Sequence, residues 1–97
     1  MLTEILKQNP GDAFTRYGLA MAYSAAGRLD EALREFATTI EKNPDYVPAY
    51  QMSAQELIKA DRLDEARVQL KAGLAVAERT HNAKATSEMS GMLDDIS

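Results

Sequence analysis

One five-residue block occurs twice in this sequence. Arg28-Leu29-Asp30-Glu31-Ala32 recurs 34 positions later as Arg62-Leu63-Asp64-Glu65-Ala66. Pro10 and Pro44 are separated by the same interval. Two unrelated landmarks therefore share one period, and that period suits a pair of helices. The sequence predicts stacked helical hairpins, in which each hairpin buries its apolar face against the next one.

Apolar residues recur at helical spacing through most of the chain and predict six helical segments, of which the first is a half unit and five are full helices. The expected ranges are 12–25, 29–42, about 48–60, 63–79 and 83–96. Gly27 and Asp61 stand where a left-handed residue ends a helix, and Asp12 stands where a side chain caps one. Pro48 fits a first helical turn, where its missing amide costs nothing. Pro44 stands four residues after Ile40, but no proline stands four residues after Leu74. The fourth helix is therefore expected to be longer.

The start of the chain repeats the end of the second helix. Leu6-Lys7-Gln8-Asn9-Pro10 mirrors Ile40-Glu41-Lys42-Asn43-Pro44, so the chain opens on the tail of such a helix. We expect a single domain over 1–97, since a chain of this length holds one core. Its expected parts are an N-terminal half repeat (1–10), repeat one (11–46), repeat two (47–80) and a capping helix (81–97).

These residues resemble the tetratricopeptide repeat family, whose unit is a helix-turn-helix of the same period. The family's small and aromatic positions, its glycine turn and its closing proline have counterparts in the first unit at Leu19, Ala20, Tyr23, Gly27, Ala32, Phe36 and Pro44. The second unit offers Tyr50, Ala54, Leu57, Asp61, Ala66 and Leu70. Departures from the pattern are Arg16 for a large aromatic residue and Ser53 for a leucine.

The resemblance implies an all-α fold, in which helix-turn-helix repeats stack as a short right-handed α-solenoid with a C-terminal capping helix. Small side chains would let neighbouring helices approach closely, and we expect this of Ala20, Ala22, Ala32, Ala54 and Ala66. The first helix of each unit would line the inner face. By resemblance, Phe14, Gly18, Ser24, Ala25 and Lys59 also face inward, and the closing helix would add Ala85, Met89 and Met92.

The function implied by the resemblance is binding of a protein or peptide partner. Relatives that clamp a terminal carboxylate use lysine and asparagine where this chain has Tyr17, Met21 and Met52, so such a clamp is not expected. An apolar, methionine-bearing groove suits an amphipathic helix or a hydrophobic peptide. The predicted contact residues are Tyr17, Met21, Gln51, Met52, Gln55 and Ile58. The closing helix could instead fold over this face and cover Met52 and Ile58.

Composition excludes several other functions. A net charge of −4 argues against sequence-independent nucleic-acid binding and against an anionic membrane surface. With no cysteine there is no disulfide or thiolate metal site. The single histidine, His81, lies in a predicted turn, and the adjacent acid pairs point in different directions on their helices. We expect no enzyme activity, cofactor or metal, and a cytoplasmic location, since the sequence shows no signal pattern or membrane span.

The alternative function is a homo-oligomerising structural module. Leu2, Ile5 and Leu6 belong to a predicted helix whose usual partner upstream is missing. That half repeat would either cap the first full unit or leave an apolar edge for another copy. A homodimer through this edge or through the final helix is the second expectation.

Overall fold

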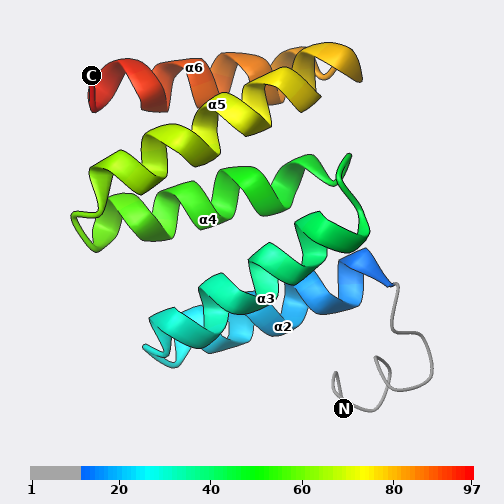
Figure 1. Cartoon of the computed structure of the whole chain (residues 1–97), viewed down its shortest axis with the longest axis vertical. Helices are drawn as coiled ribbons and strands as arrows, with labels where there is room; N and C mark the ends of the chain where they lie inside the picture. Colours follow the sequence, from blue (N-terminus) through cyan, green and yellow to red (C-terminus); the bar gives the residue numbers. More distant parts are fainter. Residues whose placement is uncertain (1–11) are drawn as a thin grey trace.

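The computed structural model describes residues 12–97, and these form five helices and no strand. The helices are α2 (Ala13–Ala25), α3 (Leu29–Lys42), α4 (Val47–Lys59), α5 (Leu63–Arg79) and α6 (Ala83–Asp95). Figure 1 shows them stacked in chain order along the longest axis. The all-α class and the solenoid arrangement are confirmed. The predicted half repeat of residues 1–10 lies outside the described residues.

Two side-chain caps fix the starts of the outermost described helices. Asp12 precedes α2 and accepts hydrogen bonds from the Thr15 amide at 3.1 Å and from its hydroxyl at 2.8 Å. These hydrogen bonds lower the pKa of the Asp12 carboxyl. Asn82 caps α6 and accepts from the Ala85 amide at 3.1 Å. Each cap satisfies an amide that has no partner inside its own helix.

Three left-handed residues reverse the chain after α2, α4 and α5. Their φ angles are 76° at Gly27, 60° at Asp61 and 58° at His81. Glycine adopts this conformation freely, whereas aspartate and histidine do so at a cost. The turns at Gly27 and Asp61 agree with the sequence prediction, and His81 ends the lengthened α5 in the same way.

Small residues bring the helices close together, as the sequence predicted for four of the five alanines. Ala20, Ala32, Ala54 and Ala66 are all fully buried. The prediction for Ala22 is wrong, because this residue is exposed. Ala22 lies two positions after Ala20, and residues two apart point about 200° away from each other around a helix.

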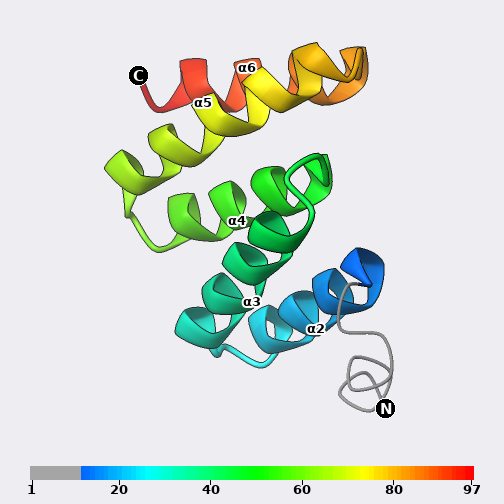
Figure 2. The ribbon, with the colours of Figure 1, turned by 45° about the vertical axis from the view of Figure 1, so that its right-hand side comes forward.

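Two core clusters hold the stack together. Alanines and Phe36 form the first, between α2, α3 and the start of α4: Ala20, Ala32, Phe36 and Ala49. The second joins α4, α5 and α6: Val47, Tyr50, Ala54, Leu70, Val76, Ala77, Ala85 and Met89. Ile40 packs against both clusters. Figure 2 shows α4 between the α2–α3 pair and the α5–α6 pair.

At Gly73 the α5 backbone lies close to both neighbouring helices. A Cβ atom placed there would lie 2.7 Å from Tyr50 Cβ and 2.7 Å from Met89 Sδ. Glycine therefore lets the α5 backbone approach both α4 and α6. Thr39, its counterpart one repeat earlier in α3, is also fully buried but carries a side chain.

The repeated pentapeptide makes the same ion pair in both units. Arg28 pairs with Glu31, and Arg62 pairs with Glu65 at 2.7 Å. Arg62 also lies 3.9 Å from Asp30, so the second copy of the block reaches the first. Each exposed ion pair of this kind adds little stability, but the pair between Arg62 and Asp30 links the two hairpins at their turns.

Candidate functional site

Three helices, α2, α4 and α6, line the inner face of the stack. They enclose a hollow of about 290 Å³, which we call the inner hollow. Its lining residues are Tyr17, Val47, Pro48, Gln51, Met52, Asn82, Lys84, Ala85 and Glu88. Three of the six predicted contact residues, Tyr17, Gln51 and Met52, therefore lie together in one concave site.

The floor of the inner hollow is held in place by aromatic packing. The Tyr17 ring lies 5.9 Å from the Phe36 ring and 5.6 Å from the Tyr46 ring, both at tilted angles. Burial raises the pKa of the Tyr17 hydroxyl, and the neighbouring Tyr46 adds to this shift. Met52 is half-buried and packs on the same cluster. The site thus offers a fixed aromatic ring beside an adaptable thioether.

The rim of the inner hollow is polar. Gln51 Nε2 donates a hydrogen bond to Glu88 Oε1 at 3.4 Å, which links α4 to α6. Lys84 is exposed, and within residues 12–97 no carboxylate lies in ion-pair distance of its ammonium. Lys84 and Glu88 carry opposite charges, so the rim is nearly neutral. The side-chain amide of Gln51, one of the predicted contact residues, therefore already has a partner in Glu88.

The other predicted contact residues lie elsewhere on the inner side. Gln55 and Ile58 line a second hollow of about 300 Å³, the end hollow, together with Lys59, Met92, Asp95 and Ile96. Met21 is half-buried and packs against the alanine and Phe36 cluster. The predicted contact residues are therefore divided between two hollows along α4, with Gln51 in the inner hollow and Gln55, one turn later, in the end hollow.

The closing helix borders the inner face and leaves part of it uncovered. Its Met89 is fully buried and its Ala85 is 6% exposed, since both pack in the cluster with α5. The expectation that Met89 lines the groove is therefore wrong. Met52 and Ile58 stay half-buried, each at the edge of a hollow that α6 flanks on one side.

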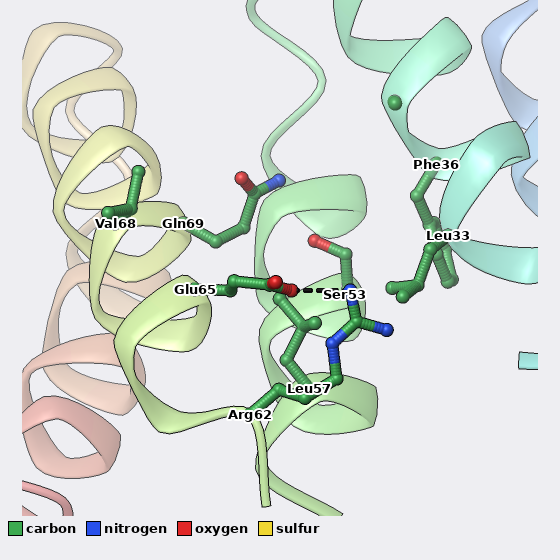
Figure 3. Close-up of a pocket in the computed structure, with 9 residues that line it drawn as sticks. Leu33, Phe36, Ser53, Leu57, Arg62, Glu65, Val68 and Gln69 are labelled. Carbon is green, nitrogen blue, oxygen red and sulfur yellow. Dashed lines mark ion pairs between the residues drawn. The ribbon is translucent and has the colours of Figure 1, made fainter. Parts of the chain in front are cut away.

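The outer side of the stack carries a third concavity that the sequence analysis did not find. This outer groove, about 350 Å³, is lined by Leu33, Phe36, Ala37, Ser53, Leu57, Arg62, Glu65, Val68 and Gln69. Figure 3 shows the Arg62–Glu65 ion pair at its rim. Val68 is 68% exposed. The available signal was Val68 itself, a large apolar side chain in the fourth predicted helix that was not assigned to the predicted core.

A partly buried polar contact between α2 and α4 was also not predicted from the sequence. The Ser24 hydroxyl donates to the Glu56 carboxylate, whose other oxygen lies 3.7 Å from Lys59 Nζ. Glu56 is only 7% exposed, so these partners satisfy a carboxylate that burial would otherwise penalise. The contact ties the end of one inner helix to the next.

A metal centre within residues 12–97 would need His, Cys, Asp or Glu side chains that lie close together. Within that range no three His, Cys, Asp or Glu side chains gather closely enough to hold a metal ion. His81 is exposed in its turn, and Asp30 and Glu31 take part in the ion pairs described above. The described helices are also too short or too polar to cross a membrane.

Comparison with known proteins agrees with this architecture. A family model described as tetratricopeptide repeat matches residues 1–57. A solution NMR structure of a tetratricopeptide repeat domain protein from Salinibacter ruber is 31% identical over 90% of this chain and 88% of that chain, with a TM-score of 0.84. A crystal structure from the same organism is 30% identical over 88% of this chain and 94% of that chain, with a TM-score of 0.80.

A further solved structure is a complex. It contains the TPR2B domain of yeast Sti1 with pHsp70, is 25% identical to this chain and has a TM-score of 0.89. It covers 98% of this chain and 76% of that chain. No curated protein matches. The family match spans more than half of the sequence, and the solved relatives share its stacked hairpins, so this chain belongs to the tetratricopeptide repeat family.

Proposed function

We propose that this protein is a small adaptor or scaffold that binds a partner peptide or helix along its inner face. The observation that carries this proposal is the inner hollow, where a fixed Tyr17 ring and Met52 form an apolar floor under a polar rim. Rigid helices present this floor in advance, so a partner segment would bind without much ordering of the receptor. The protein acts in this proposal by binding, in the cytoplasm, and not by catalysis.

The chemistry of the site favours an apolar segment of low charge. Methionine adapts its shape to different side chains, and the aromatic ring supplies a flat contact surface. Lys84 and Glu88 offset each other at the rim, so binding should depend little on salt. We expect one apolar anchor of the partner in the inner hollow and a second in the end hollow beside Ile58.

Support also comes from the complex of the yeast TPR2B domain with pHsp70, which shows that a domain of this fold engages a partner. Self-association through the final helix is the alternative. The exposed residues of α6 include Ser87, Glu88, Gly91 and Asp94, which form a polar surface. Because stable contacts between copies need apolar area, this surface favours partner binding over a dimer through α6.

The proposal can be tested by selecting peptides from a displayed random library against the wild-type protein. The binding affinity of the selected peptide is then measured by calorimetry for three variants, each confirmed to be folded by circular dichroism. Met52→Glu places a charge on the apolar floor. Pro48→Glu places one at an exposed lining position, where an acid in the first helical turn is well tolerated.

The matched control is Val68→Glu, which makes the same change of charge in the outer groove. We expect each inner-face variant to lose about tenfold or more in affinity, because a carboxylate is desolvated against apolar surface. Val68→Glu should bind like the wild type. Loss of affinity only in Val68→Glu would move the binding site to the outer groove and would refute the proposal.

A further inference from the structure

Sulfur occurs in this chain only as methionine thioether, and the described methionines differ in their surroundings. The sequence has five methionines and no cysteine. Met52 lines the inner hollow and Met92 lines the end hollow, and both are half-buried. Met21 is half-buried too but lines neither hollow, and Met89 is fully buried. Met52 and Met92 are therefore the methionines that a small solute reaches at the candidate site.

The methionine of the core is protected from solutes. Met89 is 0% exposed, and its Sδ atom would lie only 2.7 Å from a Cβ placed at Gly73. Oxidation of methionine requires access to the sulfur, so Met89 is shielded while the helices are folded. The hollows beside Met52 and Met92 measure about 290 and 300 Å³, which is ample for a molecule slightly larger than water. The structure thus separates a methionine that holds the fold from two that line the binding surface.

We propose that Met52 and Met92 are modification sites, where hydrogen peroxide converts the thioether to a sulfoxide and thereby switches off partner binding at the inner face. This inference rests on the proposed function. In the reaction a sulfur lone pair attacks one oxygen of the peroxide, so that an S–O bond forms and the O–O bond breaks. The transferred hydroxyl group gives its proton to the departing hydroxide, which leaves as water. The sulfur is oxidised, the peroxide is reduced, and no further reactant is needed.

The sulfoxide acts on the floor of the site and leaves the fold in place. Met52 packs on the same cluster as the Tyr17 ring, and Met92 packs on the cluster that holds Met89. The S–O group is polar and keeps its water in the open hollow of the free protein. An apolar partner that covers the hollow removes this water without replacing its hydrogen bonds, so binding becomes weaker. Because Met89 stays reduced, the core around it is unchanged.

The test treats the protein with hydrogen peroxide and uses the peptide selected against the wild type. Mass spectrometry of proteolytic fragments identifies which methionines have gained an oxygen, circular dichroism checks the fold, and calorimetry gives the affinity for the peptide. Met52→Leu/Met92→Leu removes both sulfurs of the site and keeps apolar side chains of similar volume. The control Met21→Leu removes a half-buried sulfur that lines neither hollow. Each protein is compared with its own untreated sample, so differences in starting affinity do not matter.

We expect oxygen to be added at Met52 and Met92 before Met89. Oxidation should lower the affinity of the wild type and of Met21→Leu about tenfold or more, and should leave that of Met52→Leu/Met92→Leu at its untreated value. Treatment with the two methionine sulfoxide reductases should restore the wild-type affinity. An equal loss in Met52→Leu/Met92→Leu, an oxidised wild type without its helical spectrum, or oxidation of Met89 ahead of Met52 would overturn the inference.

The proposed function is judged separately, on untreated protein. If Met52→Glu binds the selected peptide as well as the wild type does, the peptide does not use the inner hollow and the proposed function fails. If Met52→Glu loses affinity but the oxidised wild type, with sulfoxide at Met52 and Met92, binds as before, only the present inference fails. The order in which the methionines are oxidised needs no peptide and is read in either case.

Discussion

Substitution of alanine for glycine should have opposite effects on stability at two helical positions, Gly73 and Gly91. Gly73 lies in α5, where an added Cβ would meet Tyr50 Cβ and Met89 Sδ, each at 2.7 Å. The methionine sulfur can move, but Tyr50 Cβ is fixed to the α4 backbone, so the two helices must separate. Gly91 lies in α6, and an added Cβ there has no neighbour within 4 Å.

The magnitudes follow from two opposing terms. Alanine is favoured over glycine inside a helix by about 0.8–1 kcal/mol. Overpacking in a filled core costs about 1–3 kcal/mol. Gly91→Ala receives only the first term and should raise the free energy of unfolding. Gly73→Ala receives both, and we expect a net loss on the order of 1 kcal/mol.

Thermal unfolding followed by circular dichroism checks this pair of variants. A loss of about 1 kcal/mol should lower the melting temperature of Gly73→Ala by about 4–8 °C in a domain of this size. Gly91→Ala should melt above the wild type. If Gly73→Ala were stabilised as much as Gly91→Ala, the close approach of α4, α5 and α6 at this point would be refuted.

Three further predictions concern a helix crossing, a turn and a cap. Ala54→Leu should lower the free energy of unfolding by about 1–3 kcal/mol in urea titrations, because Ala54 is fully buried, and an unchanged midpoint would contradict this packing. Asp61→Gly should raise the melting temperature slightly, since φ is 60° at Asp61, whereas a decrease would mean that the aspartate side chain stabilises the turn. Hydrogen bonds from Thr15 lower the folded pKa of Asp12 from 3.8, so the stability advantage of the wild type over Asp12→Ala is present above that value. This advantage should disappear as the pH falls through the folded pKa. In urea titrations, the difference in free energy of unfolding between the two proteins should therefore be smaller at about pH 3 than at about pH 6.

The sequence predicted the helices well because their ends depend on local signals. Gly27 and Asp61 adopt the left-handed conformation that ends a helix, and Asp12 caps α2 through a residue only three positions away. The repeat period then implied how successive hairpins stack. Each of these features depends on a short stretch of sequence or on the repeat itself, so no distant contact had to be known.

Parts of the candidate site depend on contacts between distant residues and could not be predicted in the same way. The hydrogen bond from Gln51 to Glu88 joins residues 37 positions apart, and the Ser24–Glu56 contact joins residues 32 positions apart. Neither separation equals the repeat period. The family resemblance assigned Met89 to the inner face, but the absence of a side chain at Gly73 lets Met89 pack in the core.

The position of Ile40 between the two core clusters has a consequence for how the protein unfolds. In a stack of hairpins each unit contacts only its neighbours, so cooperativity passes through one interface at a time. Ile40 contributes to both clusters and lies in the helix that joins the α2–α3 pair to α4. The strength of the interface between α3 and α4 decides whether the α2–α3 hairpin unfolds together with the rest of the described chain or before it. In the second case α4, α5 and α6 would stay folded around Gly73.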